Sequence, residues 1–249
     1  MVGDRLSHCF DCRATLPTIL GDVFFDNVRK SPGWHCNERP VSETLFVMGI
    51  YNDRILPSLI DLVMRNGRLT PYRQRTISLA QGRVLEIGAG SGLNLPFYSG
   101  QVTEILGLDP HPKLLARARA KPSRIPWSAI EASAEAMPLE DATFDTVVST
   151  WTLCSVPAVA QALAEARRVL KPHGRFLFVE HGLALDAGVR RWQHRLTPPW
   201  KRLAGGCHLN RPIQSLIQQA GFEIDRLRTS YIAGPRPMTF TYEGSARRQ

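Results

Sequence analysis

A glycine-rich turn follows directly on a short apolar run in the segment VLEIGAGSGLNLPFY, residues 84–98. Its three glycines, Gly88, Gly90 and Gly92, stand at alternate positions. A short apolar run before a turn is typical of a buried strand, and the glycines let the backbone approach a ligand closely. The segment therefore predicts the first strand and turn of an α/β sheet, with a binding site at the end of that strand.

Strand patterns and helix patterns alternate along the rest of the chain. The periodicity predicts a helix directly after the glycine turn and another over 156–170, with Ser155 as its N-cap and Pro157 near its first turn. Alternation of this kind indicates an α/β fold, Rossmann-like and doubly wound, with a mostly parallel sheet and helices on both faces. The other expected helices cover 112–120, 187–203 and 211–220, and the expected strands cover 83–87, 104–109, 127–132, 144–150, 175–181, 222–232 and 237–244.

The first 47 residues differ from the remainder. They show no sustained helical or strand period, and prolines and glycine interrupt them. We predict an irregular N-terminal extension over 1–47, for which disorder is one expectation, and a single folded domain over 48–249. An amphipathic helix should open this domain and end near Gly67.

Two common ligands of such turns fit poorly. A P-loop needs Lys and Ser or Thr after its last glycine, and a dinucleotide fingerprint wants glycine where Leu93 stands. Asp109, at the end of the second expected strand, would place a carboxylate beside the turn, where it can accept both ribose hydroxyls of an adenosine. The alternative is a turn that only allows close packing, with Asp109 capping the next helix.

Four segments in order carry a family resemblance: EIGAGSG, GLDPHP, ASAEAMPLEDATFDTVVST and LAEARRVLKPHGRFLFVEH. They resemble the class I S-adenosylmethionine-dependent methyltransferases, closely over 83–181 and in outline over 48–240. The resemblance implies a seven-stranded sheet with a reversed last strand, S-adenosylmethionine as cofactor, and methyl transfer as the activity.

The resemblance also implies cofactor contacts, residue by residue. Ser133 departs from the Asp-Ala-Glu of many relatives, which leaves the backbone of Ala134 to meet the adenine. The loop for the methionine part is Glu86, Gly88, Ala89, Gly90 and Gly92, followed by Asn94; the ribose part falls to Asp109 with Pro110, the adenine part to Ser133, Ala134 and Glu135, and the wall beside the sulfonium to Thr150 and Trp151.

A narrower resemblance links WTLCSV, FVEHG and a later pattern of Trp192, Trp200, Cys207, Leu209 and Arg211 to thiol methyltransferases of animal endoplasmic reticulum and lipid droplets, and to their bacterial relatives. It implies a small, rather apolar acceptor, with a thiol as the leading candidate. Methylation of a lipid or a quinol is the alternative, and a cofactor-binding protein without turnover is the rival from another class. The N-terminal hydrophobic anchor of the animal proteins is not expected here.

His181 is the predicted general base, since it follows the fifth expected strand at the edge where ligands bind. The alternative is a histidine that caps or packs under the next helix, and His208 is a second candidate. Free cysteines such as Cys154 and Cys207 usually act as small buried hydrophobes. The N-terminal Cys9-x-x-Cys12 with His35-Cys36 has zinc-ligand types but fits no common spacing, so we expect no metal site.

The chain carries a formal net charge of +9, from 31 basic and 22 acidic residues. Residues 189–203 interleave cations with tryptophan and leucine, a pattern that suits either peripheral membrane contact or packing of the tryptophans on the core. We find no nucleic-acid-binding module beside this charge, so no nucleic-acid partner is expected. Without a leader pattern or a long apolar run, a cytoplasmic location is expected.

Overall fold

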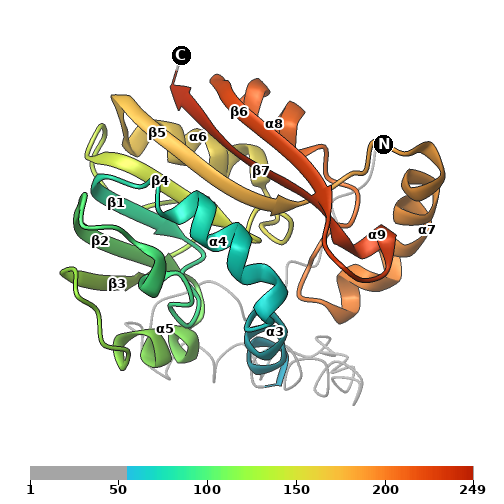
Figure 1. Ribbon diagram of the computed structural model, residues 1–249, viewed down its shortest axis with the longest axis horizontal. Coiled ribbons are helices and arrows are strands. Elements are labelled where there is room, and N and C mark those ends of the chain that lie inside the picture. Colours follow the sequence, from blue (N-terminus) through green and yellow to red (C-terminus); the bar gives the residue numbers. More distant parts are fainter. Residues whose placement is uncertain (1–54, 249) are drawn as a thin grey trace, which may run out of the picture. The chain divides into compact units, whose positions relative to one another are not determined.

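The structure is a computed structural model that describes residues 55–248. Within them, seven strands form one sheet in the order β3-β2-β1-β4-β5-β7-β6 (Figure 1). Strands β1 to β5 are parallel, and β7 runs antiparallel to both β5 and β6. The predicted fold class, including the reversed last strand, is confirmed. The strands are β1 (Gly82–Ile87), β2 (Val102–Asp109), β3 (Trp127–Glu131), β4 (Phe144–Thr150), β5 (Leu170–His181), β6 (Phe222–Tyr231) and β7 (Phe240–Arg248).

Helices cover both faces of this sheet. Figure 1 shows α4 in front of the sheet and α6 and α8 behind it. Neighbouring residues of β1 demonstrate the two faces: Val84 packs in a cluster with Ile77 of α4, and Leu85 in a cluster with Leu163 of α6. The helices are α3 (Leu56–Met64), α4 (Thr70–Ile77), α5 (Pro112–Arg119), α6 (Val159–Val169), α7 (Ala187–Leu203), α8 (Ile213–Gln219) and α9 (Arg236–Thr239), with 3-10 turns η2 (Gly67–Leu69) and η3 (Leu95–Phe97).

The helix predicted directly after the glycine turn is wrong, because the structure has only the 3-10 turn η3 there. Gly92 has a left-handed φ of +71°, so no helix can begin before Leu93. Beyond it, Asn94 and Tyr98 turn their side chains inward to Glu86. Those buried hydrogen bonds fix the backbone more strongly than helix propensity does.

Helix α6 begins at Val159, three residues later than predicted, and Ser155 does not cap it. Instead, Glu135 Oε1 accepts a hydrogen bond from the backbone N–H of Ala158, the residue directly before the helix. A carboxylate from a distant loop thus replaces the local cap, an arrangement that no local signal encodes. Helix α4 was not predicted, since its sequence TPYRQRTI has little apolar periodicity.

The predicted division of the chain between residues 47 and 48 lies outside the described residues. The helix predicted to end near Gly67 corresponds to α3, which ends at Met64. In the part of the chain that the structure describes, none of the helices combines the length and the apolar character needed to cross a bilayer.

Candidate active site

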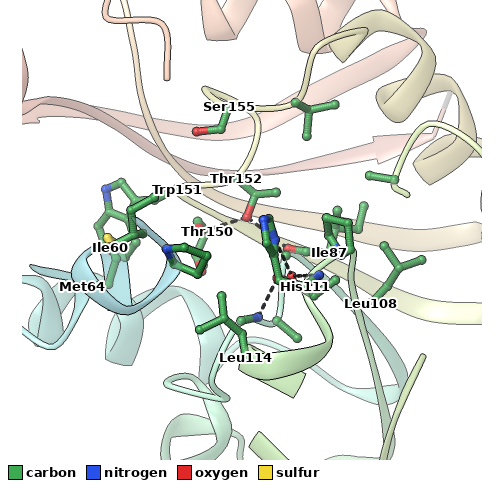
Figure 2. Close-up of a pocket in the computed structure, with 18 of the residues that line it drawn as sticks. Ile60, Met64, Ile87, Leu108, His111, Leu114, Thr150, Trp151, Thr152 and Ser155 are labelled. Carbon is green, nitrogen blue, oxygen red and sulfur yellow. Dashed lines mark hydrogen bonds and ion pairs between the residues drawn. The ribbon is translucent and has the colours of Figure 1, made fainter. Parts of the chain in front are cut away.

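A cavity of about 390 Å³ lies at the carboxyl ends of β1, β2 and β4, under helix α3. In an open parallel sheet this is the edge where ligands bind, beside the point at which strand order reverses. Figure 2 shows Ile60, Met64 and Trp151 at one end of the cavity and Ile87 and Leu108 at the other. The cavity therefore joins the glycine turn to the inner side of α3.

The three glycines of the turn do different work. A Cβ on Gly88 would lie 2.1 Å from Thr152 Oγ1, so Gly88 permits the loop after β4 to approach. A Cβ on Gly92 would lie 3.2 Å from Ala118 Cβ, so Gly92 permits the approach of α5. Gly90 has φ +52°, and apart from the Gly88 carbonyl at 3.9 Å nothing lies near its Cβ position. Gly88 and Gly92 thus allow other segments to pack against the turn, whereas the lack of a side chain at Gly90 leaves room for a ligand in the cavity.

Glu86 lies at the centre of a buried polar network beside the turn. Its Oε1 accepts from Asn94 Nδ2 at 2.8 Å and its Oε2 from the Tyr98 hydroxyl at 2.8 Å. Burial raises the pKa of Glu86 to about 7, although those hydrogen bonds and the charge of Arg73 act in the opposite direction. The carboxyl can therefore change its charge near neutral pH while remaining inside the cavity wall.

Asp109 ends β2 and reaches the cavity from beside the turn. Its Oδ2 accepts from the Gly90 backbone N–H at 2.9 Å, and its Oδ1 accepts from the His111 backbone N–H at 2.9 Å. The His111 ring also meets Oδ1, with Nδ1 at 3.2 Å. A carboxylate oxygen can accept about two hydrogen bonds, so Oδ2 keeps capacity for a ligand hydroxyl.

The loop after β3 supplies the next part of the wall. Ala134 is buried and lines the cavity, and the Ser133 hydroxyl lies 3.1 Å from Glu135 Oε2 in a local turn. Glu135 also accepts from the first turn of α6. Ser133 is thus occupied within its own loop, which leaves backbone groups as the natural partners for a ligand there.

Trp151 follows β4 with a left-handed φ of +50°, rare for a large side chain and costly by about 1–3 kcal/mol. Its backbone N–H donates to the Val179 carbonyl at 2.7 Å, which holds this conformation. The guanidinium of Arg73 covers the indole, with Cζ 4.8 Å from the ring centroid. The strained backbone places the indole of Trp151 next to Thr150, where β4 ends, and the indole forms part of the cavity wall.

Most of the predicted contacts meet in this cavity: those from Glu86 to Gly90, Asn94, Asp109, Pro110, the loop 133–135, Thr150 and Trp151 all line it. Gly92 and His181 do not. Sequence reasoning missed Arg73 and His111, which also line it. His111 follows the predicted acid by two positions and could have been found, whereas nothing marks Arg73 within the polar helix α4.

His181 is the last residue of β5, and it is 7% exposed. Its Nδ1 lies 3.9 Å from Cys207 Sγ, and Cys154 completes a cluster of three. The structure thus places the predicted base next to two thiols, outside the cavity lining. The role of His181 as a general base stays a prediction. Sequence reasoning treated the three residues singly, although all follow strands or helices that end at one edge of the sheet.

Comparison with known proteins now identifies the domain. Residues 85–178 match the family described as a methyltransferase domain. The predicted recognition is confirmed, and the predicted cofactor, S-adenosylmethionine, is that of this family.

Two curated relatives and one solved structure illustrate the similarity. The thiol S-methyltransferase TMT1B of Rattus norvegicus is 37% identical over 146 residues, 56% of this chain and 59% of the relative. The phosphatidylethanolamine N-methyltransferase of Cereibacter sphaeroides is 36% identical over 123 residues, 47% of this chain and 60% of the relative. The chain thus spans about three fifths of the length of these relatives.

A crystal structure of a methyltransferase from Thermotoga maritima, described as a possible histamine N-methyltransferase, aligns with a TM-score of 0.56 at 21% identity. The alignment covers 81% of this chain and 99% of that one. At this identity the likeness concerns the fold.

The residues around the cavity fit S-adenosylmethionine. Asp109 offers an oxygen with spare capacity beside the turn, where a ribose would be held, and Gly90 leaves the backbone open. The buried carboxyl of Glu86 suits a ligand that carries ammonium and sulfonium charges. Arg73, the buried cation of the cavity wall, suits the ligand's carboxylate.

Proposed function

We propose that this protein is an S-adenosylmethionine-dependent methyltransferase whose acceptor is a small, rather apolar thiol. One observation carries the proposal. The glycine turn, Asp109 and Trp151 line the same cavity, and most of these residues lie in the segment that matches a methyltransferase domain. The thiol S-methyltransferase TMT1B supports the choice of a thiol, since it is similar to this chain across the domain.

The apolar side chains that line one part of the cavity favour an apolar acceptor. Helix α3 contributes Leu56, Pro57, Ile60 and Met64 to the cavity lining, and Figure 2 shows Ile60 and Met64 beside Trp151. An apolar wall excludes water and favours a ligand with few polar groups. We assign the acceptor to this end and the cofactor to the end formed by the turn and Asp109.

When bound, S-adenosylmethionine supplies an electrophilic methyl group. Transfer breaks the bond from that carbon to the cofactor's sulfur and forms a bond to the acceptor's sulfur, while the thiol proton passes to water. The chain's residues orient the two ligands, and alignment of this kind can contribute about 7–11 kcal/mol to lowering the barrier. Because an anionic thiolate and a cationic sulfonium neutralise each other during transfer, the apolar wall also favours the transition state.

The proposal is tested with purified protein and methyl-labelled S-adenosylmethionine. One set of reactions contains small alkyl and aryl thiols, and a second contains vesicles with phosphatidylethanolamine or a quinol. The proposal predicts label in volatile or extractable thioethers from the first set. Label in the lipid phase alone would overturn the thiol assignment, and label in neither, with the cofactor tightly bound, would support the non-catalytic rival.

One observation favours lipid methylation as the alternative activity. Helix α7 carries Trp192 with 56% of its surface exposed, next to exposed arginines, while Val189, Gln193 and Thr197 form its buried face. An exposed tryptophan among cations suits a lipid interface. Peripheral membrane contact through 189–203 is therefore proposed with the lipid alternative, and the vesicle reactions test both. A cytoplasmic location stays a prediction from the sequence.

A further inference from the structure

The chain brings three metal-ligand side chains together next to the cavity. Cys154 lies in the loop after β4, His181 ends β5, and Cys207 lies between α7 and α8. One ligand atom from each, two sulfurs and one imidazole nitrogen, all lie within 4.8 Å of one another. Ligands of one tetrahedral zinc ion stand roughly 3.5–4 Å apart, as follows from metal–ligand bonds of about 2.0–2.3 Å. Small side-chain movements would therefore complete the geometry.

The surroundings favour a ligand over simple packing. Cys154 and His181 are 4% and 7% exposed. Within the described residues, His181 Nε2 is buried without a hydrogen-bond partner, and Nδ1 has only the long 3.9 Å contact to Cys207 Sγ. A buried imidazole whose nitrogens are so poorly satisfied is costly, unless one of them binds something further.

We propose that Cys154, His181 and Cys207 bind a Zn²⁺ ion. Thiolate and imidazole are the ligand types that zinc prefers, and three protein ligands with a fourth position for water is a recurring zinc arrangement. Two thiolates and a neutral imidazole balance the charge of the ion. Two buried side chains of opposite charge, Glu180 and Arg211, interact electrostatically with these cysteines.

An ion at this position would hold together loops that border the cavity. Ser155 and Gly205 line the cavity, and each stands within two residues of a proposed ligand. The two loops already meet through the His208 backbone N–H, which donates to the Cys154 carbonyl at 2.8 Å. A bound ion would cross-link the loop after β4, the end of β5 and the loop after α7. This inference does not rest on the proposed methyl transfer.

The test uses full-length protein, reduced with a thiol-free phosphine and titrated with Co²⁺ as a spectroscopic substitute for Zn²⁺. We expect equimolar binding, with intense thiolate-to-cobalt charge transfer and visible bands of tetrahedral cobalt, both reversed by Zn²⁺. The N-terminal Cys9, Cys12 and Cys36 are the competing ligands. The matched control is therefore the triple variant C9S/C12S/C36S, in which the spectrum should persist.

Cys207→Ser should abolish the charge-transfer band, and the fold of this variant is checked by circular dichroism. Because Cys154→Ser buries a hydroxyl in place of a thiol and so tends to destabilise the fold, alkylation mapping provides a second measurement. Zn²⁺ should slow iodoacetamide modification of Cys207 in wild-type protein and leave the N-terminal cysteines unaffected. A band lost in the triple variant, a band retained in Cys207→Ser, or no band in reduced, folded wild-type protein would each overturn the proposal.

Discussion

The guanidinium of Arg73 lies over the indole of Trp151, with Cζ 4.8 Å from the ring centroid, and joins helix α4 to the loop after β4. The same guanidinium donates to Asn94 Oδ1 at 2.6 Å and to the Met64 carbonyl at 3.2 Å. Burial lowers the pKa of Arg73 to about 10, partly offset by the charge of Glu86, so it stays charged at neutral pH. One buried cation thus links α3, the glycine-turn segment and the aromatic wall.

Replacing Arg73 by Lys should therefore damage both stability and ligand binding. Lysine keeps the charge but lacks the planar fork that serves two acceptors and an aromatic face together. We expect a loss of about 1–3 kcal/mol in the free energy of unfolding, the usual effect of a buried acceptor left unpaired. Urea denaturation measures it, with the exposed Arg124→Ala as control. Equal stability of the two variants would contradict the role assigned to this fork.

Asp109→Ala should weaken S-adenosylmethionine binding by at least about tenfold. A hydrogen bond to a charged acceptor contributes about 1.5–3 kcal/mol, and 1.4 kcal/mol corresponds to a factor of ten. Calorimetric titration measures the affinity, and Glu131→Ala, at the exposed end of β3, serves as the matched control. Unchanged affinity in Asp109→Ala would show that the ribose lies elsewhere.

Gly88→Ala and Gly90→Ala should separate packing from ligand access. Alanine at 88 places Cβ 2.1 Å from Thr152 Oγ1, so we expect about 2–4 kcal/mol of destabilisation from overpacking and the left-handed backbone. Alanine at 90 meets no such clash and should lose about 1–2 kcal/mol, while cofactor affinity falls. Thermal unfolding and calorimetry report the two effects.

Gly100→Ala is the control for this pair, since nothing lies within 4 Å of its Cβ position. It should match wild type in both measurements. A Gly88→Ala protein as stable as Gly100→Ala would mean that the loop after β4 does not pack on the turn as described.

Glu86 should make cofactor binding depend on pH. Burial raises its pKa to about 7, so the carboxyl is mostly neutral at pH 6 and mostly ionised at pH 8. A cationic ligand prefers the ionised form, and affinity should therefore rise with pH across this window. Calorimetry at several pH values tests this, and Glu86→Gln should flatten the profile. A profile that is equally steep in Glu86→Gln would assign it to another group.

The same shift affects unfolding with the opposite trend. A carboxyl whose pKa is higher in the folded protein than in the unfolded chain adds stability below the unfolded value of 4.5, and that stability is lost as pH rises through about 7. Between pH 4 and pH 8, the free energy of unfolding of the wild-type protein should therefore fall by about 3 kcal/mol relative to that of Glu86→Gln. Glu131→Gln, at the exposed end of β3, should show no such trend.

The sheet and the end of the cavity formed by the glycine turn and Asp109 were predictable from the sequence, because both depend on local patterns. An apolar run followed by glycines identifies β1 and its turn, and the same logic places Asp109 at the end of β2. These positions are fixed by strand direction, which brings carboxyl ends to one edge.

Features that depend on contacts across the chain were not predictable. Arg73 sits in a polar helix without a motif, and its partners are 9, 21 and 78 positions away. The helix expected after the turn gave way to inward hydrogen bonds from Asn94 and Tyr98. The cluster of His181 with two cysteines joins segments that only the folded sheet brings together.

The most direct test of the account follows both products of one reaction. Wild-type protein and Asp109→Ala are incubated with S-adenosylmethionine and a small alkyl thiol, and mass spectrometry quantifies S-adenosylhomocysteine and the methyl thioether. The account predicts that both products appear in equal amounts with wild type and fall together in Asp109→Ala at subsaturating cofactor. Equal product formation by the two proteins, or no S-adenosylhomocysteine from a wild-type protein that binds the cofactor, would contradict it.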